Sequence, residues 1–188
     1  MMQLQVMRLL SWIRDRLEFL LSNIYSWYSD WMDRRERKKL EKVSYPTDRI
    51  VISCDASITV NPGGRSAVGA VIRIPGRLPI HFSRHSIGKT NNEAEHEAVF
   101  HAIESVATLH YRKCDLPVDI YSDSMLVVKQ LEGKWKCKTE PLRTRRDASW
   151  EYFRLFPEVR VTWKRRNSTE DLKFANNSAQ KLNGLVPH

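Results

Sequence analysis

Four carboxylates occupy positions where a metal-dependent reaction could use them: Asp55, Glu95, Asp123 and Asp171. Asp55 directly follows the β-branched run at residues 50–54, and Asp123 directly follows a second such run at residues 118–122. Ligands of α/β proteins gather beyond the carboxyl ends of strands, so these side chains are expected to lie together. Hard oxygen ligands without a matching set of His or Cys fit Mg²⁺ or Mn²⁺ far better than Zn²⁺. Taken singly, Asp123 and Asp171 are also explained as acids that favour a helix N-terminus.

Glu95 lies on the face of a predicted helix that packs against the core. Thr90 and Glu93 have the T-x-x-E spacing of a capping box, which predicts a helix start at this point. Ala98 and Ala102 mark the apolar stripe of this helix, and Glu95 falls on the same stripe, three and seven residues earlier. A buried, unpaired carboxylate costs roughly several kcal/mol. Glu95 must therefore be protonated, paired, bound to a metal or placed at the exposed end of the stripe.

Five strands and several helices are predicted to position these carboxylates. The strands span about residues 49–59, 67–74, 80–87, 117–122 and 158–163, and the last helix spans about 169–182. The first three strands follow one another directly and are expected to pair antiparallel, whereas each of the last two follows a helix. The chain is therefore predicted to be an α/β protein with a mixed five-stranded sheet.

Five short motifs occur in order between about residue 48 and residue 185. They are Asp55-Ala56-Ser57, Asn61-Pro62-Gly63-Gly64, Thr90-Asn91-Asn92-x-Ala94-Glu95, Ser122-Asp123-Ser124-x-Leu126-Val127-Val128-x-Gln130-Leu131 and Asn167-x-x-x-Asp171. Together they resemble the motifs of type 1 ribonuclease H, most closely those of its bacterial and reverse-transcriptase-like branch. The resemblance implies a ribonuclease H-like fold in which helices flank the sheet.

The resemblance also implies a role for each of the four carboxylates. Asp55 would bridge two Mg²⁺ ions, with Mn²⁺ able to replace them. Glu95 and Asp123 would complete the ion near the leaving group, and Asp171 would help to hold the ion that activates water. The implied activity is endonucleolytic hydrolysis of the RNA strand of RNA–DNA hybrids, which leaves 3′-hydroxyl and 5′-phosphate ends.

Substrate contacts are implied in the same way. Two loops would contact the minor groove, where 2′-hydroxyls distinguish RNA from DNA. Their candidate residues are Asn61, Gly63, Gly64, Asn91 and Asn92. Thr90, besides capping the helix, would contact a phosphate of the DNA strand. Many members of the family carry a histidine in the loop before the last aspartate. This chain has Lys164 and Arg165 there instead, and either one is a candidate replacement.

The charge of the chain favours a polyanionic partner. Lys and Arg number 31 against 22 Asp and Glu, which gives a formal net charge of +9. One basic cluster consists of Lys129, Lys134, Lys136, Lys138, Arg143, Arg145 and Arg146, with Trp135 among them. It is either a patch that follows phosphates, with Trp135 as a stacking aromatic, or a solvated helix face.

Two other functions are compatible with these residues. The first is a non-catalytic nucleic-acid-binding or scaffolding module that keeps the fold. Four clustered negative charges beside a phosphate backbone argue against it, because a binding module has no need of them. The second is a related nuclease of the same fold that acts on another duplex.

Residues 1–45 are predicted to form an interaction segment that precedes a catalytic domain at residues 46–188. Apolar residues at alternating spacings of four and three over about residues 1–33 predict a long amphipathic helix, followed by a basic hinge. So large an apolar face implies a partner: itself, another protein or a membrane surface. Acidic residues on its polar side argue against the membrane, and its charges exclude a transmembrane span.

The cysteines favour a reducing, cytoplasmic location. The chain has three of them, Cys54, Cys114 and Cys137, and their spacing is not that of a metal site. An odd number without a disulfide pattern is typical of a reducing compartment.

Overall fold

A computed structural model describes residues 46–109 and 115–185 of the chain. The amphipathic helix, basic hinge and binding partners predicted for residues 1–45 fall outside these described residues. Within the described part, no helix combines the length and the apolar character needed to cross a membrane.

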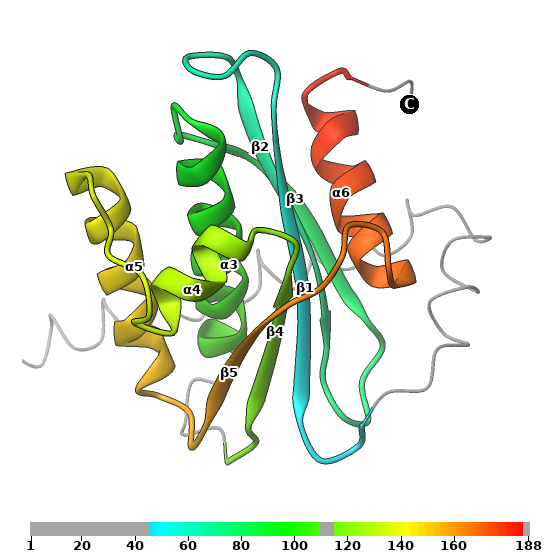
Figure 1. Cartoon of the computed structure of the whole chain (residues 1–188). Coiled ribbons are helices and arrows are strands. Elements are labelled where there is room, and N and C mark those ends of the chain that lie inside the picture. Colours follow the sequence, from blue (N-terminus) through cyan, green and yellow to red (C-terminus); the bar gives the residue numbers. More distant parts are fainter. Residues whose placement is uncertain (1–45, 110–114, 186–188) are drawn as a thin grey trace, which may run out of the picture. The chain divides into compact units, whose positions relative to one another are not determined.

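The centre of the fold is a mixed sheet (Figure 1). Its strands are β1 (Ile50–Ile58), β2 (Ser66–Arg73), β3 (Ile80–Ser86), β4 (Val118–Ser122) and β5 (Val159–Trp163). They lie in the order β3-β2-β1-β4-β5. β1, β2 and β3 pair antiparallel, whereas β4 runs parallel to β1 and β5 runs parallel to β4. The predicted strands were correct to within about one residue at each end, because β-branched runs and turn residues mark both limits.

Four helices cover the sheet in the part of the chain that the structure describes. They are α3 (Asn91–Leu109), α4 (Met125–Leu131), α5 (Glu140–Phe153) and α6 (Glu170–Leu182). Figure 1 shows α3, α4 and α5 on one side of the sheet and α6 on the other. The fold is therefore a three-layer α/β arrangement, which confirms the predicted fold class.

Side-chain hydroxyl groups fix where three of these helices begin. Thr90 Oγ1 accepts the Glu93 N–H at 3.3 Å before α3, as the capping-box spacing predicted. Ser124 Oγ accepts the Val127 N–H at the start of α4, at 3.4 Å. Thr169 Oγ1 accepts the Leu172 N–H at the start of α6, at 3.2 Å. These caps set the helix registers that carry the candidate site residues.

The alternation of side chains along β1 separates two environments. Ile50, Ile52, Cys54 and Ala56 pack into the main core with α3 and α4. Ser57 faces the opposite side, where the Asn183 amide beyond the end of α6 donates to Ser57 Oγ at 2.7 Å. Asp55 is two residues from Ser57 and therefore shares its side of the strand.

The helix α6 lies unusually close to the sheet at Gly69. This residue pairs with Asp55 across β1 and β2. A Cβ atom at Gly69 would clash with the carbonyl group of Ala175 in α6. Glycine is therefore needed where α6 crosses the strand next to Asp55.

Candidate active site

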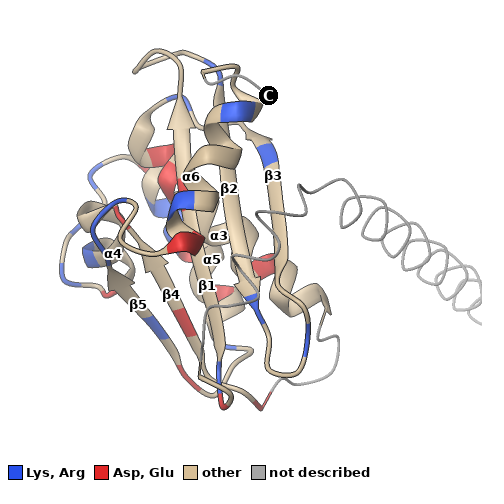
Figure 2. Ribbon diagram, turned by 90° about the vertical axis from the view of Figure 1, so that its right-hand side faces the viewer, with Lys and Arg blue, Asp and Glu red and all other residues tan. Residues whose placement is uncertain are grey.

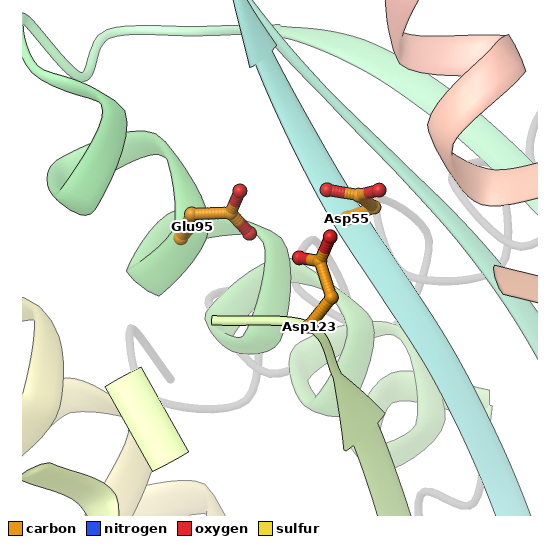
Figure 3. A group of neighbouring side chains, drawn as sticks. All are labelled: Asp55, Glu95 and Asp123. Carbon is orange, nitrogen blue, oxygen red and sulfur yellow. The ribbon is translucent and has the colours of Figure 1, made fainter. Parts of the chain in front are cut away.

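Three carboxylates from separate segments converge at the centre of the sheet (Figure 3). Asp55 comes from β1, Glu95 from the first turns of α3, and Asp123 from the turn between β4 and α4. One oxygen atom from each residue lies within 4.8 Å of the corresponding atoms of the other two. In Figure 3 the three side chains point toward one another. The middle of β1, the turn after β4 and the first turns of α3 thus bring together residues that lie far apart in the sequence.

Burial and mutual repulsion make Asp55 and Glu95 hard to ionise without a cation. Asp55 and Glu95 are each only 1% exposed. Burial, together with the nearby charge of Asp123, raises the pKa of Asp55 to about 7. Burial and the charges of Asp55 and Asp123 raise the pKa of Glu95 well above its ordinary value. A divalent cation would relieve both effects.

The donor chemistry of the group fits a hard divalent cation. Asp55 Oδ1 accepts the Ala56 N–H at 2.7 Å, which fixes the orientation of this carboxylate. Glu95 Oε2 is buried and has no hydrogen-bond partner among the described residues. A buried carboxylate oxygen without a donor is suited to bind a metal ion. Three carboxylates that meet at one point are the oxygen set that Mg²⁺ or Mn²⁺ takes from a protein.

Arg166 supplies the positive charge nearest to this group, and the sequence reasoning did not select it. Its Nε atom donates a hydrogen bond to Asp123 Oδ2, and its Nη2 atom lies 4.0 Å from Asp55 Oδ1. The two positions suggested by the resemblance lie differently. Lys164 Nζ lies over the ring of Tyr121, 5.1 Å from its centroid, and Arg165 is exposed. In this structure the third residue of the Lys-Arg-Arg run, not the first or second, contacts the carboxylates.

Asp171 does not belong to the carboxylate group in the part of the chain that the structure describes. It is buried in the first turn of α6, where both of its oxygens accept hydrogen bonds from the guanidinium group of Arg73. Arg73 pairs with Val51 across the sheet, four residues before Asp55. The role of Asp171 as a fourth metal ligand stays a prediction, and it would require this ion pair to open.

The helix α6 presents an amide on the face that meets β1. Asn183 bonds to Ser57 of β1, and Asn176 lies two helical turns earlier on the same face. Asn176 is buried, and its Nδ2 atom donates to Asn167 Oδ1 at 3.4 Å in the loop that carries Arg166. The sequence offered no reason to single out this residue, because an asparagine within a helix has no distinctive spacing.

The two loops predicted to read the minor groove are bonded to each other. Asn61 Oδ1 accepts the Asn91 N–H at 3.2 Å, and the Gly63 N–H donates to the Lys89 carbonyl at 2.7 Å. These bonds join the loop between β1 and β2 to the start of α3. Asn92 is exposed at this place. These bonds bring the candidate substrate residues of the first loop, Asn61, Gly63 and Gly64, close to those at the start of α3, Thr90, Asn91 and Asn92.

Part of the predicted basic cluster is neutralised within the fold. Glu132 Oε2 forms ion pairs with Lys129 Nζ, at 3.0 Å, and with Lys134 Nζ, at 3.1 Å. Arg145 turns inward, where its Nη2 atom lies 2.6 Å from Glu97 Oε1. Arg145 therefore ties α5 to α3 and does not extend a phosphate-binding surface.

The exposed remainder of the cluster lies in the loop between α4 and α5. Lys136 and Lys138 are exposed, and half of the surface of Trp135 is accessible. Figure 2 shows basic ribbon segments in this loop and in the loop after β5. The surface that can meet a polyanion is thus smaller than the sequence cluster suggested, but it keeps the exposed aromatic side chain.

The strand order, the placement of the helices and the central carboxylates define a ribonuclease H-like protein with a candidate metal-binding site. The chain belongs to the reverse transcriptase-like family, whose model matches residues 53–181. This match covers the sheet from within β1 and extends almost to the end of α6.

Two curated proteins show related sequences. The chain is 30% identical over 126 residues to ribonuclease HI of Halobacterium salinarum (strain NRC-1), which covers 66% of this chain and 61% of that protein. It is 43% identical over 114 residues to the uncharacterized protein YpeP of Bacillus subtilis (strain 168), which covers 57% of this chain and 47% of that protein. The matches thus span less than two thirds of either relative.

Solved structures show the same fold. The crystal structure of RNase H1 from Halobacterium salinarum NRC-1 superposes with a TM-score of 0.63 at 27% identity, over 73% of this chain and 99% of that chain. LC11-RNase H1 in complex with an RNA/DNA hybrid gives a TM-score of 0.62 at 24% identity, over 71% of this chain and 99% of that chain. The predicted resemblance to type 1 ribonuclease H is confirmed at the level of family and fold.

Proposed function

We propose that this chain is an endonuclease that hydrolyses the RNA strand of RNA–DNA hybrids. The observation that carries the proposal is the convergence of Asp55, Glu95 and Asp123 within 4.8 Å in a ribonuclease H-like fold. The similarity to a protein known as ribonuclease HI supports the same activity. Three buried carboxylates next to one another would destabilise a protein that used the fold only for binding.

The carboxylates would hold the metal ions of the reaction. When bound there, two Mg²⁺ ions, or Mn²⁺ in their place, would supply the positive charge that activates water and stabilises the departing oxygen. In the proposed assignment Asp55 would hold both ions, and Glu95 and Asp123 would hold the one near the leaving group. The products would carry 3′-hydroxyl and 5′-phosphate ends. Asp171 could join the second ion only after leaving Arg73.

The joined loops would place the RNA strand over these carboxylates. Exposed polar groups at the start of α3, among them Asn92, would face the 2′-hydroxyls of the minor groove. The backbone N–H of Asn91 and of Gly63 is already bonded between the loops, so the loops are held in shape before substrate arrives. The hydroxyl oxygen of Thr90 accepts the hydrogen bond that caps α3, so its hydroxyl hydrogen would be available to bond a phosphate of the DNA strand.

The basic loop, residues 132–139 between α4 and α5, would contact the hybrid away from the reacting phosphate. Lys136 and Trp135 are exposed, so they can meet a phosphate and a base or sugar, respectively. Lys134 shares Glu132 with Lys129 and would contribute less. The affinity of this loop for nucleic acid should therefore depend mainly on Lys136, Lys138 and Trp135.

A comparison of substrates tests the proposal. The full chain is incubated with matched RNA–DNA hybrid, double-stranded RNA and double-stranded DNA, in Mg²⁺ and then in Mn²⁺. Cleavage of the RNA strand of the hybrid alone, absent in Asp55→Asn and retained in the exposed control Asp115→Asn, is the expected result. Cleavage of another duplex would select the related-nuclease reading, and binding without cleavage in either metal would select a non-catalytic module.

A further inference from the structure

Arg166 contacts the carboxylates that the proposed function assigns to the metal. Its Nε atom donates to Asp123 Oδ2, and its Nη2 atom lies 4.0 Å from Asp55 Oδ1. These carboxylate side chains are only 6% and 2% exposed, whereas the side chain of Arg166 is 54% exposed. The guanidinium group thus enters a buried acidic site from solvent.

The backbone around Arg166 is fixed even though its side chain is exposed. The Lys164 N–H donates to the Ser122 carbonyl at 2.9 Å, and Trp163 Nε1 donates to the Asp123 carbonyl at 2.9 Å. After Arg166, Asn167 adopts a φ of 56° and its side chain accepts a hydrogen bond from Asn176. The start of the loop is therefore bonded to the same turn that carries Asp123, and the side chain can move while the backbone stays in place.

An arginine in this position competes with a divalent cation for the same carboxylate oxygens. The Asp123 oxygen that accepts its hydrogen bond is an atom that a metal would coordinate, and a guanidinium charge beside it repels a second cation. Without an ion, the same charge offsets the mutual repulsion of the buried carboxylates. The guanidinium group of Arg166 therefore stabilises the ion-free site and weakens the binding of a cation to it.

We propose that Arg166 is an internal counter-cation that a divalent ion must displace from Asp123. Metal binding is then an exchange in which Asp123 releases Arg166 and accepts the ion. The released guanidinium group stays beside the site, where its planar pair of donors matches a phosphate. This inference rests on the proposed metal site, but it concerns the affinity for metal and not the reaction.

The test measures metal affinity directly. Mn²⁺ is titrated into the full-length protein by calorimetry and, separately, by electron paramagnetic resonance. Arg166→Gln is compared with Arg165→Gln, because both remove one positive charge from the same loop and only Arg166 bonds to Asp123. Arg166→Gln is expected to bind Mn²⁺ roughly tenfold more tightly than Arg165→Gln, since the ion no longer has to break a charge-assisted hydrogen bond.

Thermal unfolding provides a second readout. Without metal, Arg166→Gln should unfold at a lower temperature than Arg165→Gln, and saturating Mn²⁺ should remove this difference. Equal or weaker Mn²⁺ binding in Arg166→Gln would overturn the inference while leaving the metal site intact. No Mn²⁺ binding in any variant, including the unmodified chain, would instead reject the proposed function. Arg166→Lys, which keeps the charge, should lie between the two glutamine variants.

Discussion

Arg73 holds Asp171 with two parallel hydrogen bonds, from Nε to Oδ2 at 2.7 Å and from Nη2 to Oδ1 at 2.9 Å. Asp171 is 1% exposed and the side chain of Arg73 is 11% exposed, so this is a buried ion pair. It joins the start of α6 to the end of β2, 98 residues earlier in the chain. The acid that sequence motifs assign to catalysis thus has a structural partner.

This ion pair predicts that Asp171→Asn lowers stability more than it lowers metal affinity. Replacing the Asp171 carboxylate with an amide weakens two charge-assisted hydrogen bonds, which is expected to lower the free energy of unfolding by about 1.5–3 kcal/mol. Denaturant unfolding without metal measures that loss, and Mn²⁺ titration measures the affinity. Asp55→Asn is the comparison, because it should abolish metal binding. The opposite pattern, lost metal binding with little change in stability, would show that Asp171 leaves Arg73 and acts as a ligand.

Asp55→Asn and Asp123→Asn are expected to abolish hydrolysis of the hybrid while keeping the fold. The change is nearly isosteric and removes a negative charge from a crowded group, so the ion-free protein should not lose stability in Asp55→Asn. Asp123→Asn also loses its ionic partner Arg166 and should be the less stable of the two. Circular dichroism checks the fold, and cleavage assays in Mg²⁺ check activity. Undiminished turnover in both variants would disprove the ligand assignment.

The sequence was sufficient to predict the strands and helices and to select three of the proposed metal ligands, because both depend on local patterns. β-Branched runs followed by an aspartate drew attention to Asp55 and Asp123. Asp123 directly follows β4, whereas Asp55 lies within β1 and not at its end. The helical period placed Glu95 on the buried face of α3, where it is 1% exposed. Each of these inferences needed only neighbouring residues, and the parallel pairing of β1 with β4 then brought Asp55 close to Asp123.

Side-chain contacts between distant segments could not be predicted from local sequence patterns. No residue near Asp171 in the sequence indicates that it pairs with Arg73, because this ion pair depends on where α6 packs against β2. In the same way, three consecutive basic residues follow β5, and only the backbone path decides which of them turns inward. Lys164 continues the strand through its bond to Ser122, and the turn at Asn167 then directs Arg166 to Asp123.

The raised pKa of Asp55 predicts an inverse dependence of stability on pH in the ion-free protein. Its pKa is about 7 in the fold against an ordinary value of 3.8. Between these values the folded state binds a proton that the unfolded state has lost, so stability falls as pH rises from about 4 to about 7 and stays low above that. The contribution amounts to roughly 4 kcal/mol at most. The measurement is denaturant unfolding in chelator across this range.

Asp55→Asn is the control for this pH dependence, because an amide does not titrate. The difference in stability between the variant and the unmodified chain should grow in favour of the variant as pH rises through this range. Saturating Mn²⁺ should remove the difference for the unmodified chain by favouring its ionised form. A difference that does not change with pH would mean that Asp55 is already ionised at acidic pH.

The basic loop predicts a change in the salt dependence of substrate binding. Replacing Lys136 and Lys138 together with Ala should raise KM, leave kcat largely unchanged, and reduce the slope of log K against log salt by about one for each lost phosphate contact. Lys134→Ala is the matched control, because Lys134 is paired with Glu132 and should contribute less. A double variant with the same salt slope as the unmodified chain would show that these lysines are only solvated.

Trp135 allows the aromatic part of the same loop to be tested separately. Half of its surface is accessible, although tryptophan is usually buried to a large extent. Trp135→Ala should weaken binding of the hybrid by about 1–3 kcal/mol if the ring stacks on a base or sugar, and the salt slope should not change. Tryptophan fluorescence during titration with hybrid gives an independent signal. Unaltered affinity would assign the ring to a structural role in the loop.

Deleting residues 1–45 is expected to leave a folded and active domain. The first strand begins at Ile50, and Asp55, Glu95 and Asp123 all lie beyond residue 46. The shortened chain should be a soluble monomer that binds Mn²⁺ as tightly as the full chain. The full chain should instead self-associate or need a protein or lipid partner, because the amphipathic helix predicted from the sequence of residues 1–33 would expose a large apolar face. Light scattering of both proteins, with and without liposomes, separates these outcomes. A shortened chain that unfolds would place residues 1–45 within the folding unit and move the domain boundary.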